Sequence, residues 1–404
     1  MANEHTFMDK RIPYAMPVHG QEEFDAVAEV LNTHTTIMGK KVVAFQERVA
    51  KLFAKKHGIM VNSGSSANLL AIEALDLPAG SEVITPAMTF ATTVSPLMQK
   101  GLVPVFTDAV EGTYLLNIDQ IEPLLTPKTK ALMVPSLLGN IPDYQRLQKI
   151  AKEHNLFLVE DSCDTLGATI NGVPTGKFTD ISTTSFYGSH IITAGGNGGL
   201  IAVNNDEWKR KIMVLRGWGR SSAADETEDI ETRFSHELDG EPHDSKFIFE
   251  AAGYNFLPNE MCAAFGLAQL DKLPKFTEIR RKNFADLLEF YQPYKEYFIL
   301  PQQMTGAETV WLAFPLTIKP GAPFTRMEIM KYLEEHNVQT RPTFSGNILR
   351  HPGFKHLATR GVGTYPVSDN IMRHAFLTAC HHGLTPEDIA YIKQLMTDFI
   401  KRKK

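Results

Sequence analysis

Short apolar runs alternate with longer amphipathic runs from about residue 58, and this alternation constrains the fold more than any other feature. Apolar runs of four to eight residues are typical of buried strands, whereas a period of 3.6 is typical of helices. Strands that alternate with helices favour a mostly parallel sheet covered on both faces. The sequence therefore predicts an α/β fold. We expect strands at 58–62, 82–86, 102–107, 131–135, 156–161, 181–186 and 200–204, and helices at 65–77, 89–100 and 144–155.

A second, smaller module is predicted after this alternation ends. Two long helices are expected at 259–273 and 276–297, followed by a strand at 311–318, a helix at 326–336 and a final helix after Pro386. A chain of 404 residues is long enough for two domains. We therefore expect an N-terminal segment and large domain over 1–275 and a small domain over 276–404.

The stretch 221–246 interrupts the pattern with nine acidic residues and few apolar ones. It is either a solvated excursion or a lid near the active site, because long loops in compact domains are often functional. The residues alone leave both interpretations open.

Charge and cysteine usage exclude several classes of protein. Lys+Arg 41 against Asp+Glu 46 gives a net charge of −5, which argues against binding along nucleic acid. We expect no membrane span and no secretory signal, because no run approaches 18 apolar residues and no apolar core follows the charges of 1–11. The basic end, 401–404, is expected to be a solvated tail. Cys163, Cys262 and Cys380 are widely spaced without a Cys-x-x-Cys pair, so we expect no metal site and a reducing, cytoplasmic location.

Three short segments carry candidate chemistry at the ends of expected strands. Residues 62–67 link a strand to a helix with small residues, which favours an anion at the helix N-terminus but is also common in turns and caps. Asp161 ends a strand, where a buried carboxylate needs a cationic partner and an exposed one needs none. His190 lies in a Gly-rich stretch, 184–199, that lacks the P-loop pattern. None of these segments is specific by itself.

Taken in order, the motifs resemble the DegT/DnrJ/EryC/StrS sugar aminotransferases, a group of fold-type-I pyridoxal phosphate (PLP) enzymes. The resemblance covers nearly the whole chain and rests on motifs at 63–66, 86–90, 159–161, 185–187 and 253–270. It implies a three-layer domain with a mostly parallel sheet and a smaller C-terminal α/β domain. It also implies PLP or its amine form, pyridoxamine phosphate (PMP), as cofactor.

The resemblance implies a role for each matching residue. Gly64, Ser65 and Ser185 are expected to hold the cofactor phosphate, and Phe90 to stack on its ring. Asp161 is expected to pair with the ring nitrogen and keep it protonated. Asn255 is expected to reach the phosphate in a neighbouring subunit, which implies a homodimer with shared active sites.

His190 departs from the aminotransferase pattern. Aminotransferases of this family carry a lysine five residues after the serine of the Ser-Phe motif, and that lysine bonds covalently to the cofactor. Lys177 and Lys209 are out of register with this position. An imidazole cannot replace the amine, so the resemblance implies a cofactor that is not covalently bound. A histidine can still move protons at neutral pH.

This substitution resembles the 3-dehydratase branch, which acts on nucleotide-linked 4-keto-6-deoxyhexoses in deoxysugar biosynthesis. Further segments agree with that branch: 160–164, ending in Asp164, which we expect at the cofactor; 216–220, with Trp218 and Arg220; and 340–347, with Arg341 and Asn347. The last four residues are expected to contact substrate. In the implied reaction, PMP condenses with the C4 ketone and His190 moves the proton that accompanies loss of the C3 hydroxyl.

The cysteine pattern separates two versions of this chemistry. One version uses an iron–sulfur cluster held by cysteines after the Trp-Gly-Arg segment, where this chain has none before Cys262. We therefore expect an iron–sulfur-independent dehydratase that recharges its cofactor with an amino donor such as glutamate. Asn197 stands where the family usually has Glu. This departure bears on the shape of the part of the site that would face the substrate. A nucleotide-sugar aminotransferase and a non-catalytic PLP- or sugar-binding paralogue remain the alternatives.

Overall fold

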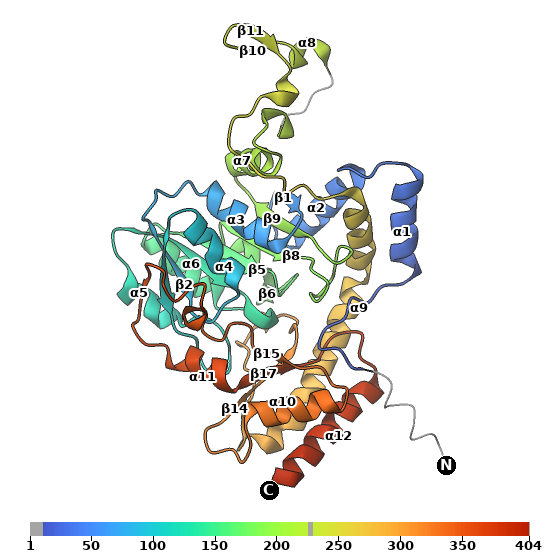
Figure 1. Cartoon of the computed structure of the whole chain (residues 1–404), viewed down its shortest axis with the longest axis vertical. Helices are drawn as coiled ribbons and strands as arrows, with labels where there is room; N and C mark the ends of the chain where they lie inside the picture. The colour runs from blue at the N-terminus through green and yellow to red at the C-terminus, as the bar shows by residue number, and fades with distance from the viewer. Residues whose placement is uncertain (1–10, 225–228, 404) are drawn as a thin grey trace.

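The computed structural model describes residues 11–224 and 229–403 (Figure 1). The expectations for residues 1–10, for the acidic positions 225–228 and for Lys404 therefore lie outside the described residues. The helices are α1 (Gln21–Asn32), α2 (Lys40–Leu52), α3 (Gly64–Ala74), α4 (Ala91–Gln99), α5 (Ile121–Leu124), α6 (Tyr144–Glu153), α7 (Asp206–Arg216), α8 (Ile230–Arg233), α9 (Glu260–Tyr291), α10 (Arg326–Glu335), α11 (Pro366–His374) and α12 (Pro386–Lys403).

An eight-stranded sheet forms the centre of the molecule, in the order β1-β9-β8-β5-β4-β2-β3-β16. Its strands are β1 (His57–Val61), β2 (Glu82–Pro86), β3 (Val103–Thr107), β4 (Thr129–Pro135), β5 (Phe157–Ser162), β8 (Ile181–Ser185), β9 (Gly199–Val203) and β16 (Arg360–Gly361). Neighbouring strands from β8 to β16 are parallel, and β9 is antiparallel to both β1 and β8. The predicted strands of this region are confirmed to within two residues at each end.

Both faces of this sheet are buried, as the alternation of side chains along the strands shows. In β1, Ile59 and Val61 join a core with residues of α3 and α7, whereas Met60 packs with residues of α2 and α9. Residues of β4 and β5 pack with α6 on that second face. Because successive side chains of a strand point to opposite faces, helices cover the sheet on both sides. The predicted three-layer α/β arrangement is confirmed.

A second, antiparallel sheet lies in the C-terminal part of the chain. It has the order β12-β14-β17-β15, with β12 (Phe298–Ile299), β14 (Phe314–Ile318), β15 (Arg341–Pro342) and β17 (Ala375–Thr378). It packs with α10, α11 and α12 in one core. The expected strand at 311–318 begins later, at Phe314, because the backbone N–H of Leu312 donates to Leu138 and not to this sheet. A small sheet contains β6 (Thr169–Ile170) and β7 (Val173–Pro174), which lie between β5 and β8 in sequence, and β13 (Ala307–Glu308), which lies between β12 and β14.

The two long helices expected at 259–273 and 276–297 are one helix, so that prediction is wrong. α9 continues through Pro274 for 32 residues, and the proposed boundary at residue 275 falls inside it. A proline in a helix interior costs about 3 kcal/mol, because it removes one hydrogen bond and crowds the preceding turn. Leu273 and Phe276 on either side are buried, and this burial offsets the cost. In Figure 1, α9 runs from the large sheet to the C-terminal helices.

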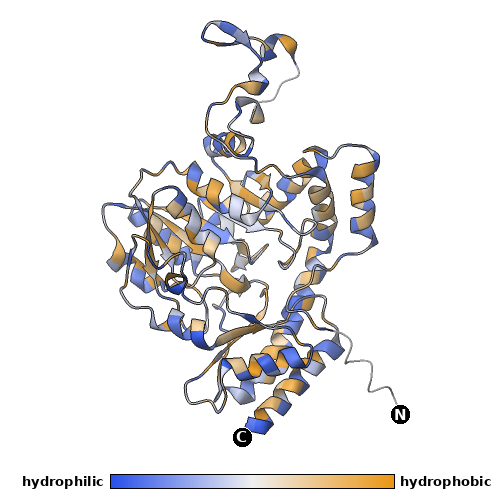
Figure 2. Cartoon of the chain, in the orientation of Figure 1, coloured by the Kyte–Doolittle hydropathy of each residue, from blue (hydrophilic) through white to orange (hydrophobic). Residues whose placement is uncertain are grey.

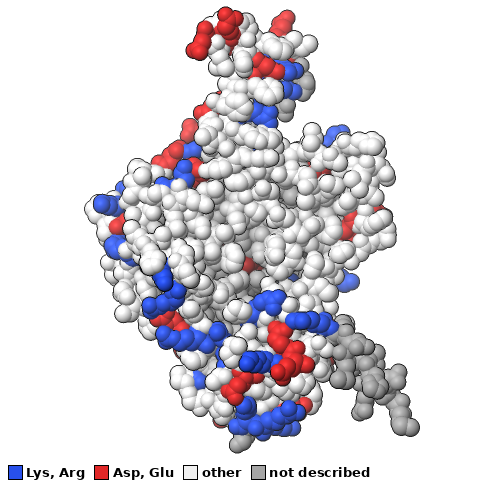
Figure 3. Space-filling model, viewed as in Figure 1, with Lys and Arg blue, Asp and Glu red and all other residues white. Residues whose placement is uncertain are grey.

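The acidic segment projects from the body as an arm, which we define as residues 229–250 (Figure 1). It contains α8 and a two-stranded hairpin, β10 (His236–Leu238) with β11 (Glu241–His243), which the sequence did not predict. Figure 3 shows acidic side chains on the arm, and Figure 2 shows apolar residues among them. No described residue of the arm lines the cavity described below. In one chain, the arm therefore does not act as a lid that lines this cavity.

Within the described residues, every helix is too short or too polar to cross a bilayer.

Candidate active site

A cavity of about 350 Å³ lies beyond the carboxyl ends of five strands of the large sheet. Loops after β1, β2, β4, β5 and β8 contribute to it, as expected for a parallel sheet. The predicted residues that line it are Gly64, Ser65, Phe90, Asp161, Asp164, Ser185 and His190. The structure therefore brings together segments that are up to 126 positions apart in sequence, and the roles of these residues stay predictions.

β5 ends in two carboxylates that point to opposite faces of the sheet. Asp161 lies on the face covered by α3, and Glu160 lies on the other face, as the alternation along a strand requires. Glu160 is fully buried and accepts hydrogen bonds from the hydroxyls of Ser162 at 2.6 Å and Ser182 at 2.8 Å. Burial raises the pKa of Glu160. Only Asp161 lines the cavity.

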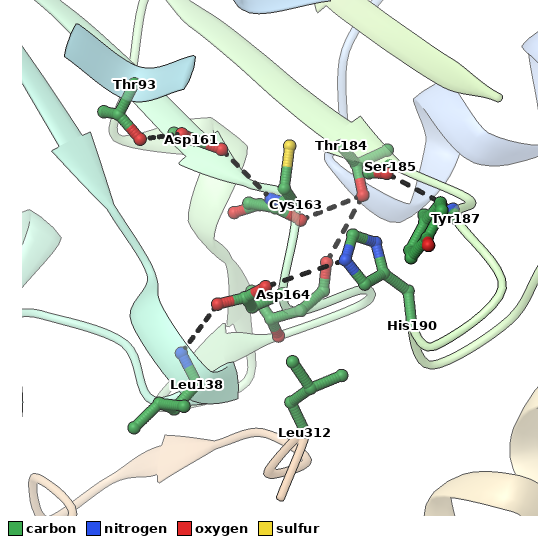
Figure 4. Close-up of polar contacts among 12 residues, drawn as sticks. Thr93, Leu138, Asp161, Cys163, Asp164, Thr184, Ser185, Tyr187, His190 and Leu312 are labelled. Carbon is green, nitrogen blue, oxygen red and sulfur yellow. Dashed lines mark hydrogen bonds and ion pairs between the residues drawn. The ribbon is translucent and has the colours of Figure 1, made fainter. Parts of the chain in front are cut away.

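The Asp161 carboxylate is buried with neutral donors only. Asn68 Nδ2 donates to Oδ2 at 2.8 Å and Thr93 Oγ1 at 2.7 Å, while the backbone N–H of Cys163 donates to Oδ1 at 3.2 Å. These contacts hold the side chain in one orientation toward the cavity (Figure 4). A buried carboxylate is costly without a cationic partner, so the site fits a cation from a ligand. A protonated pyridine nitrogen is such a cation.

The N-terminus of α3 faces the same cavity with small residues and hydroxyls. Ser63 caps the helix by accepting from the backbone N–H of Ser66 at 3.1 Å. A Cβ at Gly64 would lie 2.6 Å from the Cβ of Ser185, so only glycine permits this close approach of α3 to β8. Backbone N–H groups at a helix N-terminus and serine hydroxyls favour an anion such as a phosphate. The cavity therefore fits both charged ends of PLP or PMP.

The half-buried His190 faces the buried Asp164 on the other side of the cavity (Figure 4). His190 Nε2 lies 3.8 Å from Asp164 Oδ1, which is too long for a hydrogen bond, and Asp164 Oδ2 accepts from the backbone N–H of Leu138 at 2.9 Å. Burial lowers the pKa of His190 to about 4 and raises the pKa of Asp164 to about 7. Near neutral pH, His190 is therefore a neutral imidazole that can accept a proton.

No lysine of the described chain lines this cavity. Lys177 ends a short 3-10 helix, and Lys209 lies in α7. Burial lowers the pKa of Lys55 to about 8, but its ammonium group donates to the backbone carbonyls of Thr179 and Asp180 outside the cavity. His190 lines the cavity, whereas these three lysines do not.

Three predicted residues lie at the base of the arm and do not line the cavity of the same chain. Asn255 pairs with Gly217 in an antiparallel bridge, and the backbone N–H of Trp218 donates to Tyr254 at 2.7 Å. The Arg220 guanidinium lies 4.1 Å from the centroid of the Trp218 ring. These contacts place Trp218, Arg220 and Asn255 together, away from the cavity of their own chain.

The two predicted residues in the C-terminal part also lie outside the cavity. Arg341 is exposed and lies 5.1 Å from the ring of Tyr14, which does line the cavity. Asn347 is buried, and its amide donates to Asp369 at 2.7 Å. The Asn347 side chain is therefore held by a hydrogen bond to α11 and does not line the cavity.

Several lining residues were not predicted. Asn68 lies three positions after Ser65 and Thr93 three positions after Phe90. Helical spacing could therefore have placed each of them on the same side of its helix as the predicted residue. Tyr14 and Phe344 come from opposite ends of the chain, and their rings close the cavity with Phe90, whose centroid is 6.0 Å from that of Phe344. No local pattern announces these two, because tertiary contacts alone bring them here.

The profile of the DegT/DnrJ/EryC1/StrS aminotransferase family matches residues 17–397. The lipopolysaccharide biosynthesis protein RfbH of Salmonella typhimurium is 36% identical over 96% of this chain and 91% of its own. The dTDP-4-dehydro-2,6-dideoxy-D-glucose 3-dehydratase of Saccharopolyspora spinosa is 38% identical, over 89% and 80%.

Among solved structures, a GDP-4-keto-6-deoxymannose-3-dehydratase with a trapped PLP-glutamate geminal diamine is similar, with a TM-score of 0.87 and 28% identity over 95% of this chain and 99% of that one. The fold of PLP-dependent sugar aminotransferases and dehydratases, predicted from the sequence, is confirmed. The chain belongs to the DegT/DnrJ/EryC1/StrS aminotransferase family of PLP-dependent, sugar-modifying enzymes.

Proposed function

We propose that this protein is a 3-dehydratase that removes the C3 hydroxyl of a nucleotide-linked 4-keto-6-deoxyhexose in deoxysugar biosynthesis. The observation that carries the proposal is the uncharged, half-buried His190 at the cavity, in the position where aminotransferases of the family have lysine. Without that lysine, the cofactor is held without a covalent bond. The two relatives named as 3-dehydratases support the reaction, but their nucleotides differ, so we leave the nucleotide open.

The residues around the cavity divide the binding of PLP or PMP among them. The N-terminus of α3, with Ser65 and Ser185, would hold the phosphate, and Asp161 would hold the ring nitrogen. Phe90 is half exposed at the cavity and offers an aromatic face to the ring. When bound, PMP supplies an amine for the C4 ketone and a ring that withdraws electrons.

His190 would act as the single acid and base of the reaction. Its imidazole is uncharged near pH 7, so it can take a proton from the cofactor carbon that carries the amine and return it to the departing C3 hydroxyl. Asp164 lies close enough to stabilise the imidazolium that this transfer creates. Neither step uses a metal ion.

We further propose a homodimer with shared sites, in the cytoplasm, and glutamate as the donor that restores the amine. Asn255, Trp218 and Arg220 lie outside the cavity of their own chain, and the arm beside them exposes apolar side chains. The middle of the face in Figure 3 carries few charges, which is typical of the centre of an interface. The glutamate held in the similar dehydratase structure supports that donor, and the free cysteines suit a reducing compartment.

Borohydride treatment and His190→Asn test this proposal. PLP should stay removable by dialysis after borohydride, because no lysine at the cavity can be fixed to it. The variant should bind PMP as tightly as the wild type but lose the exchange of the cofactor's C4′ proton with solvent when a nucleotide 4-keto sugar is present. Cofactor fixed covalently to the protein, or unchanged exchange in the variant, would contradict the proposal.

A further inference from the structure

Arg280, in the middle of α9, is a buried cation whose partners are all uncharged. It is 1% exposed and ranks among the largest fully buried side chains of the described residues. Nε donates to His382 Nδ1 at 3.0 Å, and Nη1 donates to the backbone carbonyls of Trp311 at 3.3 Å and Leu312 at 3.1 Å. Burial lowers the pKa of His382 to about 2, so this partner is neutral as well.

The remaining contact of Arg280 leads to the candidate catalytic residue. Nη2 donates to the backbone carbonyl of His190 at 3.4 Å. One guanidinium thus joins four separate segments: α9, the loop after β8, the Trp311–Leu312 backbone that precedes β14, and the residues after β17 that include His382. Leu312 also lines the cavity, next to the Asp164–His190 pair (Figure 4).

The positive charge of Arg280 does little to stabilise the fold. Removing a guanidinium from water costs several kcal/mol, and carbonyl dipoles compensate less than a carboxylate does. An apolar side chain of similar length could fill the same space. Retention of the charge is therefore better explained by its effect on the neighbouring histidine.

We propose that Arg280 is the positioning residue of His190: it fixes the His190 loop against the C-terminal part and adds a positive charge that opposes protonation of the imidazole. This inference rests on the proposed role of His190 as acid and base. A fixed carbonyl sets where the ring can lie, and a buried positive charge disfavours a second positive charge close by.

The other groups around His190 do not replace this effect. Asp164, from the segment after β5, faces Nε2 and would favour the charged ring, while Tyr187 of the same loop contacts the ring edge at 5.9 Å between centroids. Asp161 and Cys163 line the same cavity from β5 and the residues after it. Burial lowers the pKa of His190, Arg280 lowers it further, and a hydrogen bond with the backbone of Ser185 acts in the opposite direction. Among the charged groups of the described residues, Arg280 is the one that lowers this pKa.

Titration of the His190 ring in the cofactor-free protein tests the electrostatic part. Ring-labelled histidine is followed by NMR, and His190→Asn assigns the signal. We expect Arg280→Met to raise the pKa of His190 by about 1 unit and Arg280→Lys, which keeps the charge, to leave it within about 0.3 units. Arg281→Met is the matched control, because the neighbouring Arg281 is exposed. An unchanged His190 titration in Arg280→Met would overturn the proposal.

Arg280→Lys separately tests the positioning part, and it keeps the proposal falsifiable if Arg280→Met does not fold. A lysine cannot reproduce the planar fork, so we expect C4′ proton exchange to fall about tenfold while the pH midpoint stays the same. Wild-type exchange in this variant would overturn the positioning role. If the wild type shows no exchange with any keto sugar, the proposed function fails, whereas the ring titration still decides whether Arg280 controls His190.

Discussion

Asp161 and its neighbour Glu160 show that the direction of a side chain determines whether a residue lines the site or belongs to the core. Both are buried acids at the end of β5, but Asp161 meets the cavity and Glu160 meets a cluster of hydroxyls behind the sheet. The sequence predicted the importance of Asp161, because the family motif includes it. The neutral donors Asn68 and Thr93 were not predicted, although each lies three positions after a predicted residue, at helical spacing.

We expect Asp161→Asn to weaken PMP binding by ten- to a hundredfold, because the neutral amide no longer pairs with a protonated ring nitrogen. Glu160→Gln is the matched control, because it makes the same change on the opposite face. It should lower the melting temperature by a few degrees while leaving PMP affinity at the wild-type value. Fluorescence titration with PMP and thermal melting measure the two effects. Equal loss of affinity in both variants would contradict the assignment.

The lowered pKa of His190 predicts a pH dependence of folding. Burial holds the pKa near 4 in the folded protein, against about 6.5 in an unfolded chain. The contribution of His190 to stability is therefore complete above pH 6.5 and is lost as the pH falls toward 4, because the unfolded chain takes up the proton first.

At pH 5.2, unfolding of His190→Asn in urea should take up about one proton fewer than unfolding of the wild type. Potentiometric titration of native and unfolded protein counts these protons. His356→Asn, at an exposed position, is the matched control for removing one imidazole. Equal uptake by the wild type and His190→Asn would show that His190 is not held neutral.

At the scale of elements, seven strands of the large sheet were predictable because most are short apolar runs between turn residues, whereas the two-residue β16 was not predicted. The continuity of α9 was not, because local rules end a helix near Pro274, whereas burial on both sides maintains it. The arm hairpin was hidden for a related reason: β10 and β11 carry exposed, charged residues and lack the apolar pattern of a strand. Tertiary contacts override local preference in both cases.

The junction between β9 and the turn before α3 gives a prediction at this scale. A Cβ at Gly199 would lie 2.2 Å from the carbonyl oxygen of Ser63 and 2.6 Å from the backbone nitrogen of Gly64. Gly199→Ala should therefore displace the turn and weaken PMP binding at least about tenfold. Gly188→Ala is the control, because its nearest atom would be 3.8 Å away. Binding of PMP at wild-type affinity by Gly199→Ala would show that this turn does not hold the phosphate.

For the whole molecule, the structure of one chain leaves five predicted residues outside its cavity, three of them at the base of the arm. Trp218, Arg220 and Asn255 were predicted from motifs that do not state whether they act within one chain or between two. A sequence contains no direct signal for this distinction, and neither the orientation of the arm nor the neighbouring apolar surface could be predicted. The dimer is therefore the proposal that unites these residues with the site.

The exposed face of the arm tests the dimer. Phe247 is 57% exposed although it is a large apolar residue. If the arm packs on a second copy, Phe247→Ser should weaken self-association at least about tenfold, as truncation of a buried interface residue does. Met327→Ser is the control, because Met327 is an exposed apolar residue on α10, away from the arm. Analytical ultracentrifugation over a range of concentrations measures the change. A purely monomeric wild type, or identical self-association in Phe247→Ser, would contradict the dimer through the arm.

The central claim is that PMP and His190 together remove water from a nucleotide-linked 4-keto-6-deoxyhexose. The most direct measurement is mass spectrometry after incubation of the protein and PMP with a panel of such sugars, with His190→Asn alongside. The account predicts a product that has lost the C3 hydroxyl, formed by the wild type and absent with the variant. An amino sugar formed by transfer of the PMP nitrogen, or no change in any sugar of the panel, would contradict it.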